Sequence, residues 1–90
     1  MRAAKKAKAA AAFKALMKAR TTIPAKLVRA FQKSKTPDAK IAVLTAQKQW
    51  LEQQLRSGIL RGAYLEKVRA KIVAIERLVK RILQTEVGGS

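Results

Sequence analysis

The sequence from Leu51 to Leu83 reads LEQQLRSGILRGAYLEKVRAKIVAIERLVKRIL and combines a helix end, a glycine-flanked turn and a long basic helix. Apolar residues in its second half recur every three or four positions, which places them on one stripe of a helix. The stripe consists of Leu65, Val68, Ile72, Ile75, Val79 and Ile82. Such spacing averages about 3.5 residues, the period of a helix packed along a second helix. Away from the stripe lie Lys67, Arg69, Lys71, Arg77, Lys80 and Arg81.

Charge is the dominant feature of the composition. The chain has 90 residues, enough for one small domain with a thin core. It contains 21 Lys and Arg residues against 5 Asp and Glu residues, a net charge of +16. Residues 1–37 hold eleven bases and no acid, giving +11, and residues 38–90 hold ten bases and five acids, giving +5. A compact domain with this self-repulsion is hard to stabilise alone, so the charge predicts a polyanionic partner.

The composition argues against several other classes of function. Cysteine and histidine are absent, which removes disulfides, thiolate and imidazole catalysis and ordinary zinc sites. The five acids lie ten to fourteen residues apart, and no glycine-rich phosphate loop or nucleophile elbow occurs. Two phenylalanines, one tyrosine and one tryptophan are too few for base stacking to be the main mode of binding. We therefore predict a non-enzymatic protein without cofactor or metal.

The N-terminal region, residues 1–37, has the composition of a basic helical arm. Residues 2–20 are rich in helix formers, but their apolar side is thin and contains mainly Phe13, Leu16 and Met17. Such a helix gains order on a surface that neutralises its lysines, either a nucleic-acid backbone or an anionic membrane. The small apolar wedge favours nucleic acid. Residues 1–36 also have the acid-free composition of a mitochondrial transit peptide.

Two further helices are expected before the glycine-flanked turn. Thr22 as N-cap and Pro24 in the first turn predict a short helix that runs to about Gln32. Thr36 as N-cap, followed by proline and aspartate, predicts a longer helix from Pro37 to about Ser57. The seam of that helix is expected at Ile41, Leu44, Leu51 and Leu55. Lys48 occupies the remaining seam position, where its stem can line the seam while its amine reaches solvent or phosphate.

The turn and the last helix complete the predicted architecture. Gly58 and Gly62 flank a short connection, which makes the helices on either side antiparallel neighbours. The last helix is expected at about residues 63–86, roughly 36 Å long. Val43 and Trp50 lie beside the seam, where they can meet the N-terminal helices, and Phe31 lies on the apolar stripe of the short helix. All three are expected to face a protein partner where the chain leaves them uncovered. The prediction is an all-α fold, with a long antiparallel helical hairpin (38–90) preceded by a basic arm (1–37) of one or two shorter helices.

The hairpin region resembles a known family. The residues that carry the resemblance are Leu51, Gln54, Leu55, Gly58 and Leu60 around the turn, then Leu65, Val68, Arg69, Ile72 and Ile75. In this stretch the chain is similar to the two-helix large-subunit ribosomal protein family numbered twenty-nine in the bacterial series. The resemblance implies a hairpin that lies on ribosomal RNA, with Arg69 and Lys71 on phosphates and Arg77, Lys80 and Arg81 continuing the strip. Ala74 departs from this family, which often has arginine there, and residues 2–35 have no counterpart in its compact members.

Three functional hypotheses remain open. The first is a ribosomal RNA-binding protein that neutralises phosphates without reading sequence. The second is a virion-internal or DNA-packaging protein that coats genomic nucleic acid and docks on a protein shell. The third is a helical interaction or membrane-surface subunit of a larger complex. Of the two nucleic acids, RNA is favoured over DNA. Neighbouring proteins of a large assembly are expected as further partners, and a membrane partner is not expected. The predicted nucleic-acid contacts are Arg2, Lys5, Lys6, Lys8, Lys14, Lys18, Arg20, Lys26, Arg29, Lys33, Arg69, Lys71, Arg77, Lys80 and Arg81.

Overall fold

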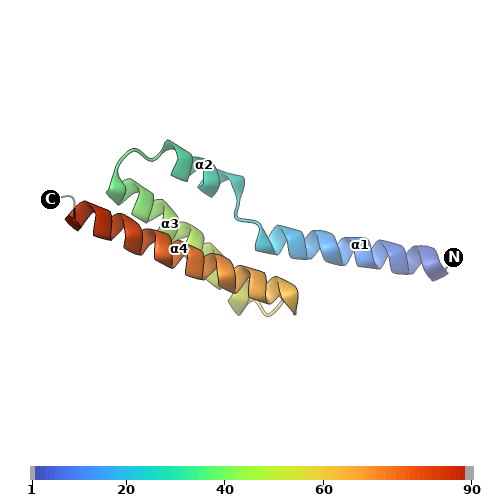
Figure 1. Cartoon of the computed structure of the whole chain (residues 1–90). Helices are drawn as coiled ribbons and strands as arrows, with labels where there is room; N and C mark the ends of the chain where they lie inside the picture. Colours follow the sequence, from blue (N-terminus) through green and yellow to red (C-terminus); the bar gives the residue numbers. More distant parts are fainter. Residues whose placement is uncertain (1, 89–90) are drawn as a thin grey trace.

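The computed structural model describes the backbone of residues 2–88 and the side-chain surroundings of residues 10–85. Within the described backbone the chain forms four helices and no strand: α1 (Arg2–Thr21), α2 (Ala25–Lys33), α3 (Pro37–Arg56) and α4 (Ala63–Gly88). Helices α3 and α4 lie side by side as an antiparallel hairpin, α2 packs along α3, and α1 extends past the turn end of the hairpin (Figure 1). The predicted all-α hairpin is confirmed.

The molecule is elongated. It measures 66 × 23 × 17 Å, and its radius of gyration is 17.0 Å, against about 12 Å for a compact chain of this length. The difference arises because α1 meets the hairpin only near its C-terminal end. Residues 10–16 of α1 are exposed, whereas Met17 and Thr21 are buried. The fold therefore spreads its charge over a larger surface than a compact chain of this length would have.

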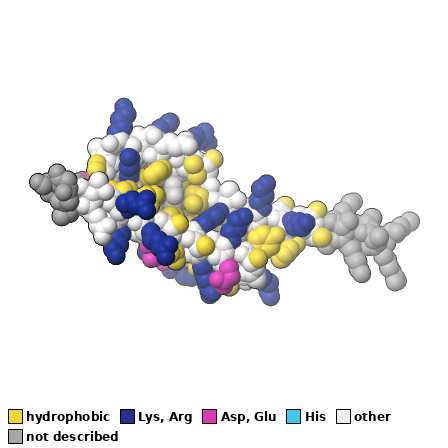
Figure 2. Space-filling model, in the orientation of Figure 1, with side chains coloured by type: hydrophobic (Ala, Val, Ile, Leu, Met, Phe, Trp, Pro, Cys, Tyr) yellow, Lys and Arg dark blue, Asp and Glu magenta, His cyan; other side chains and the backbone are white. Residues whose placement is uncertain are grey.

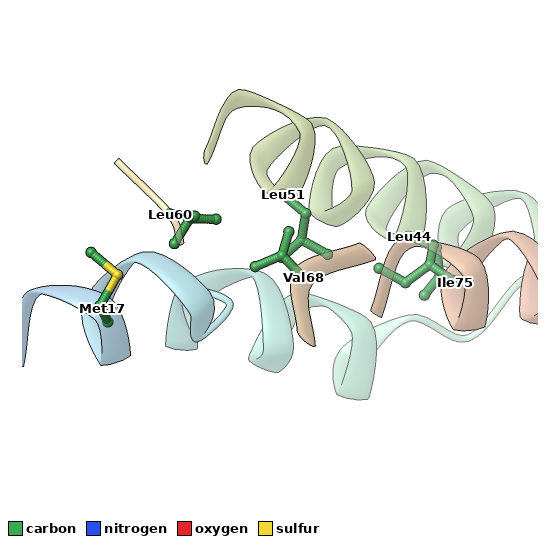
Figure 3. Close-up of a cluster of buried hydrophobic side chains, with 6 residues drawn as sticks. All are labelled: Met17, Leu44, Leu51, Leu60, Val68 and Ile75. Atoms are coloured by element: carbon green, nitrogen blue, oxygen red, sulfur yellow. The ribbon is translucent and has the colours of Figure 1, made fainter. Parts of the chain in front are cut away.

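The hydrophobic core runs along the interface of α3 and α4 and ends at α1. Its buried members are Met17, Leu44, Leu51, Leu60, Val68 and Ile75 (Figure 3). Leu51 and Val68 have no exposed surface at all, and they meet at the centre of the hairpin. Leu60 in the connection lies near Met17, so the turn of the hairpin also supports α1 (Figure 3). Further apolar residues packed against this core include Leu55, Leu65, Ile72, Val79 and Ile82.

The predicted seam of α4 is confirmed, but that of α3 is shifted. Ile41 is only half-buried, and the fully buried line of α3 consists of Leu44, Gln47, Leu51 and Gln54. The shift arises because α3 packs against α4 on one side and against α1 and α2 on the other. The Gln47 side-chain amide donates to the Leu27 carbonyl of α2 at 3.1 Å, which satisfies a polar group inside the interface.

Partner-facing residues of the prediction are partly covered by the chain itself. Phe31 and Trp50 are half-buried and pack against the core, and Val43 is also half-buried. A second correction concerns the start of α2, because Thr22 is not its N-cap. The Thr22 amide donates to the Lys18 carbonyl at 3.0 Å and so completes α1. Pro24 takes the cap position instead, and its carbonyl accepts the first bonds of α2.

The other helix boundaries follow the predicted capping chemistry. The Thr36 hydroxyl accepts a hydrogen bond from the Ala39 amide at 3.1 Å, with Pro37 in the first turn of α3. The connection after α3 requires positive φ at Gly58 (73°) and Gly62 (57°). Helix α4 continues to Gly88, two residues beyond the predicted end, and residues 89–90 lie outside the described range.

Candidate nucleic-acid interface

A basic groove lies where α1 meets the start of α4. We call it the junction groove, and it is lined by Lys14, Lys18, Thr21, Thr22, Tyr64 and Lys67, with a volume of about 330 Å³. The three lysine side chains are exposed, and none of the described residues that line the groove is acidic. Lysine ammonium groups and hydroxyl groups are the kinds of side chain that contact phosphate oxygens. The groove therefore has the chemistry of an anion-binding site.

The position of α1 is fixed by contacts at its C-terminal end. Met17 and Thr21 are 1% and 2% exposed, and the Thr21 hydroxyl donates to the Met17 carbonyl at 2.9 Å. On the exposed side, the Phe13 and Tyr64 rings pack edge to face with centroids 6.3 Å apart. These contacts hold two turns of α1 beside α4, so Lys14 and Lys18 are placed next to Lys67.

Lys71 has a structural role that the sequence did not indicate. Its ammonium group donates to the Thr21 carbonyl, one of the C-terminal carbonyls of α1 that lack a partner within the helix. A cation at this end also complements the helix dipole. Burial, and then the nearby charge of Lys67, lower the pKa of Lys71 from its usual value. The phosphate contact predicted for Lys71 stays a prediction, and this structure gives its amine a partner on α1.

Arg20 is also turned toward the protein. Its guanidinium donates to the Gln54 side-chain oxygen at 3.3 Å, and Arg20 is half-buried. Gln54 in turn donates to the Trp50 carbonyl at 3.3 Å. This chain of hydrogen bonds joins α1 to the C-terminal part of α3 and removes Arg20 from the set of freely exposed bases.

Helix α2 carries a second group of bases on its outer face. Lys26, Arg29 and Lys33 are spaced by three and four residues and, together with Ala30, surround a shallow hollow of about 320 Å³. All three side chains are exposed. The predicted contacts on α2 therefore lie together because they share one helix face. No contact between helices is needed to group them.

The bases of α4 do not form the single strip that was predicted. By helical spacing, Lys67, Arg77 and Arg81 lie on one side of α4, and Arg69 and Lys80 lie on another. The second side also contains Glu76, and Glu66 lies between the two sides. Arg69 pairs with Glu66 at 3.1 Å, which is an exposed pair of little energetic weight.

The ion pairs among the described residues do not balance the positive charge of the junction groove. Glu76 pairs with Lys48 of α3 at 3.3 Å across the hairpin, and the Lys48 side chain keeps 35% of its surface exposed. Neither of these ion pairs involves a residue that lines the junction groove. The predicted contacts Arg2, Lys5, Lys6 and Lys8 lie outside residues 10–85, whose side-chain surroundings the structure describes.

Sequence reasoning placed Lys67 on the basic side of α4 but did not include it among the nucleic-acid contacts. Thr22 and Tyr64 were missed as well, since a hydroxyl carries no pattern of its own. Thr22 and Tyr64 lie beside the lysines of the junction groove only because α1 packs against the hairpin. Among the described residues, no cluster of three or more acids, cysteines or histidines could hold a metal ion, and no helix is long and apolar enough to cross a bilayer.

Comparison with protein-family models, with curated protein sequences and with solved structures finds no match to this chain. The functional argument therefore rests on the geometry and charge of the molecule itself.

Proposed function

We propose that this protein binds nucleic acid through its phosphates, without enzymatic activity, as a structural RNA-binding component of a large ribonucleoprotein. The observation that carries the proposal is the convergence of Lys14, Lys18 and Lys67 on one groove whose other lining residues are three hydroxyl-bearing side chains and include no acid. Lysines displace condensed counterions from phosphates, which gives strong, salt-dependent and sequence-independent binding. The bases on the outer face of α2 provide a second positive surface.

The hairpin supports RNA as the preferred nucleic acid. Leu51 to Ile75 is similar in sequence to the ribosomal family described above, and α3 and α4 have the antiparallel arrangement that this similarity implies. The same bases could coat DNA, which is the alternative function. The two nucleic acids differ in groove shape and in the 2′-hydroxyl, and not in phosphate charge.

The first test measures how binding depends on salt. We expect the affinity for a short RNA duplex to fall steeply with salt, because each phosphate contact contributes about 0.7–0.9 to the slope of log K against log salt. Changing Lys14, Lys18 and Lys67 to Gln should lower this slope by roughly 2 to 3. The matched control changes Lys40, Arg56 and Arg61 to Gln, which removes the same charge elsewhere.

Equal losses in the two triple variants would mean that net charge alone determines binding and that the junction groove is not a site. The same titration with a DNA duplex of equal length separates the two functions, since tighter binding of DNA would favour genome coating. Binding to anionic vesicles without binding to either duplex would contradict the proposal and support a membrane-surface role.

A further inference from the structure

An apolar groove lies between α2 and α4, with α3 as its floor. Val28 and Phe31 of α2 and Ala74 and Leu78 of α4 line its walls, and its volume is about 250 Å³. The floor is formed by Leu44 and Ile75, which are 3% and 7% exposed. Figure 2 shows hydrophobic side chains gathered over this region, with Lys and Arg side chains on either side. No Cα atom of α2 lies within 8 Å of one in α4, and the groove occupies the space between the two helices.

A basic hollow continues this groove along α4. It has a volume of about 350 Å³ and includes Lys35, Lys40, Arg81 and Ile82 in its lining. Leu78 in the apolar groove and Ile82 in the basic hollow are four residues apart, so both hollows lie on one face of α4. From residue 74 to residue 85 this face is about 17 Å long. None of the described residues that line either hollow is acidic.

The chemistry of the two hollows selects one kind of occupant. A nucleic-acid backbone has no large apolar side groups to cover Val28, which is 39% exposed, and a second copy of a chain with net charge +16 is repelled by the bases. An amphipathic helix covers such a groove with apolar residues spaced by three and four positions. Carboxylates beside those residues would pair with the bases of the adjoining hollow, since none of the described residues that line it is acidic.

We propose that the groove between α2 and α4 docks an acidic amphipathic helix of a partner protein. Apolar residues of that helix cover Val28, Phe31 and Leu78, and its carboxylates contact the bases of the adjoining hollow, Lys35, Lys40 and Arg81. This surface is separate from the junction groove, so the proposal goes beyond nucleic-acid binding and does not depend on it. A protein that holds a polyanion on one surface and an acidic helix on another is suited to join the two in an assembly.

The test uses a synthetic peptide probe with the full-length protein. The peptide is helical, about 14 residues long, with leucines spaced by three and four positions and a following turn of glutamates. A scrambled peptide of identical composition controls for charge. We expect the ordered peptide to bind roughly tenfold more tightly at about 0.15 M salt.

A pair of variants locates the binding surface. Ala74→Phe places a ring in the groove from an exposed position and should weaken binding of the ordered peptide about tenfold. Val73→Phe is the matched control, because Val73 is the adjacent exposed residue, with 44% of its surface accessible, and does not line the groove. Circular dichroism of both variants verifies that the helices are retained.

Several outcomes would overturn the proposal. Equal affinity for the two peptides would mean attraction by charge alone, and an equal effect of the two variants would place the peptide elsewhere. Weaker RNA binding by Ala74→Phe, but not by Val73→Phe, would assign the groove to nucleic acid. Self-association that Ala74→Phe abolishes would assign it to a second copy. The junction-groove variant with Gln at positions 14, 18 and 67 should keep its preference for the ordered peptide, which separates this proposal from the proposed function.

Discussion

Lys71 is the residue whose contact in the structure differs most from the contact expected from the sequence. Its ammonium group stabilises the C-terminal end of α1 through the Thr21 carbonyl, while burial and Lys67 disfavour its charge. We expect Lys71→Met, which keeps an apolar chain but removes the donor, to lower the free energy of unfolding by about 1 kcal/mol at neutral pH. Chemical denaturation measures this loss. Lys67→Met is the control, because Lys67 is exposed, and its effect should stay within about 0.5 kcal/mol.

The lowered pKa of Lys71 also gives this residue a pH signature. Because the folded state releases the Lys71 proton more readily than the unfolded state, the unfolded chain binds more protons between the two pKa values. The contribution of Lys71 to stability therefore increases with pH in the window that ends near the usual lysine pKa of 10.5. The difference in unfolding free energy between the native protein and Lys71→Met should widen from pH 7 to pH 10. A constant or shrinking difference would contradict this role.

At the scale of elements, helix type and order could be predicted from the sequence, but the faces of α3 could not be. Apolar periodicity identified the α4 seam, and the Thr36–Pro37 pair identified the start of α3. Gln47 and Gln54 are buried although they are polar, because each finds a hydrogen-bond partner on another helix. Likewise, the three bases of α2 follow from spacing alone, whereas the junction groove depends on the docking of α1. Tertiary contacts of this kind leave no local signal.

The turn between α3 and α4 gives a prediction at the same scale. Gly58 has φ of 73°, and a Cβ atom built there meets nothing within 4 Å. Gly58→Ala should therefore cost about 1 kcal/mol of unfolding free energy, through backbone strain and not through a clash. Gly58→Asn is the matched control and should cost less, because asparagine tolerates this conformation. Urea denaturation compares the two variants, and an equal or larger cost for Asn would show that the strain argument fails.

For the whole molecule, charge and shape together predict two opposite responses to salt. A chain with net charge +16 repels itself, and the elongated fold has only a thin core to oppose that repulsion. Raising the salt concentration from about 0.05 to 0.5 M shortens the Debye length and should raise the free energy of unfolding, by on the order of 1 kcal/mol. The same change weakens the attraction of the protein to phosphates, so nucleic-acid affinity should fall while intrinsic stability rises.

Thermal unfolding with and without an RNA duplex, across this salt range, measures both responses at once. At low salt the duplex should raise the melting temperature strongly, because a ligand that binds only the folded state stabilises it in proportion to RT ln(1 + [L]/Kd). At high salt this gain should vanish while the free protein melts at a higher temperature than before. If salt destabilised the free protein, self-repulsion could not be what limits its stability. The polyanionic partner would then lose the physical argument that first predicted it.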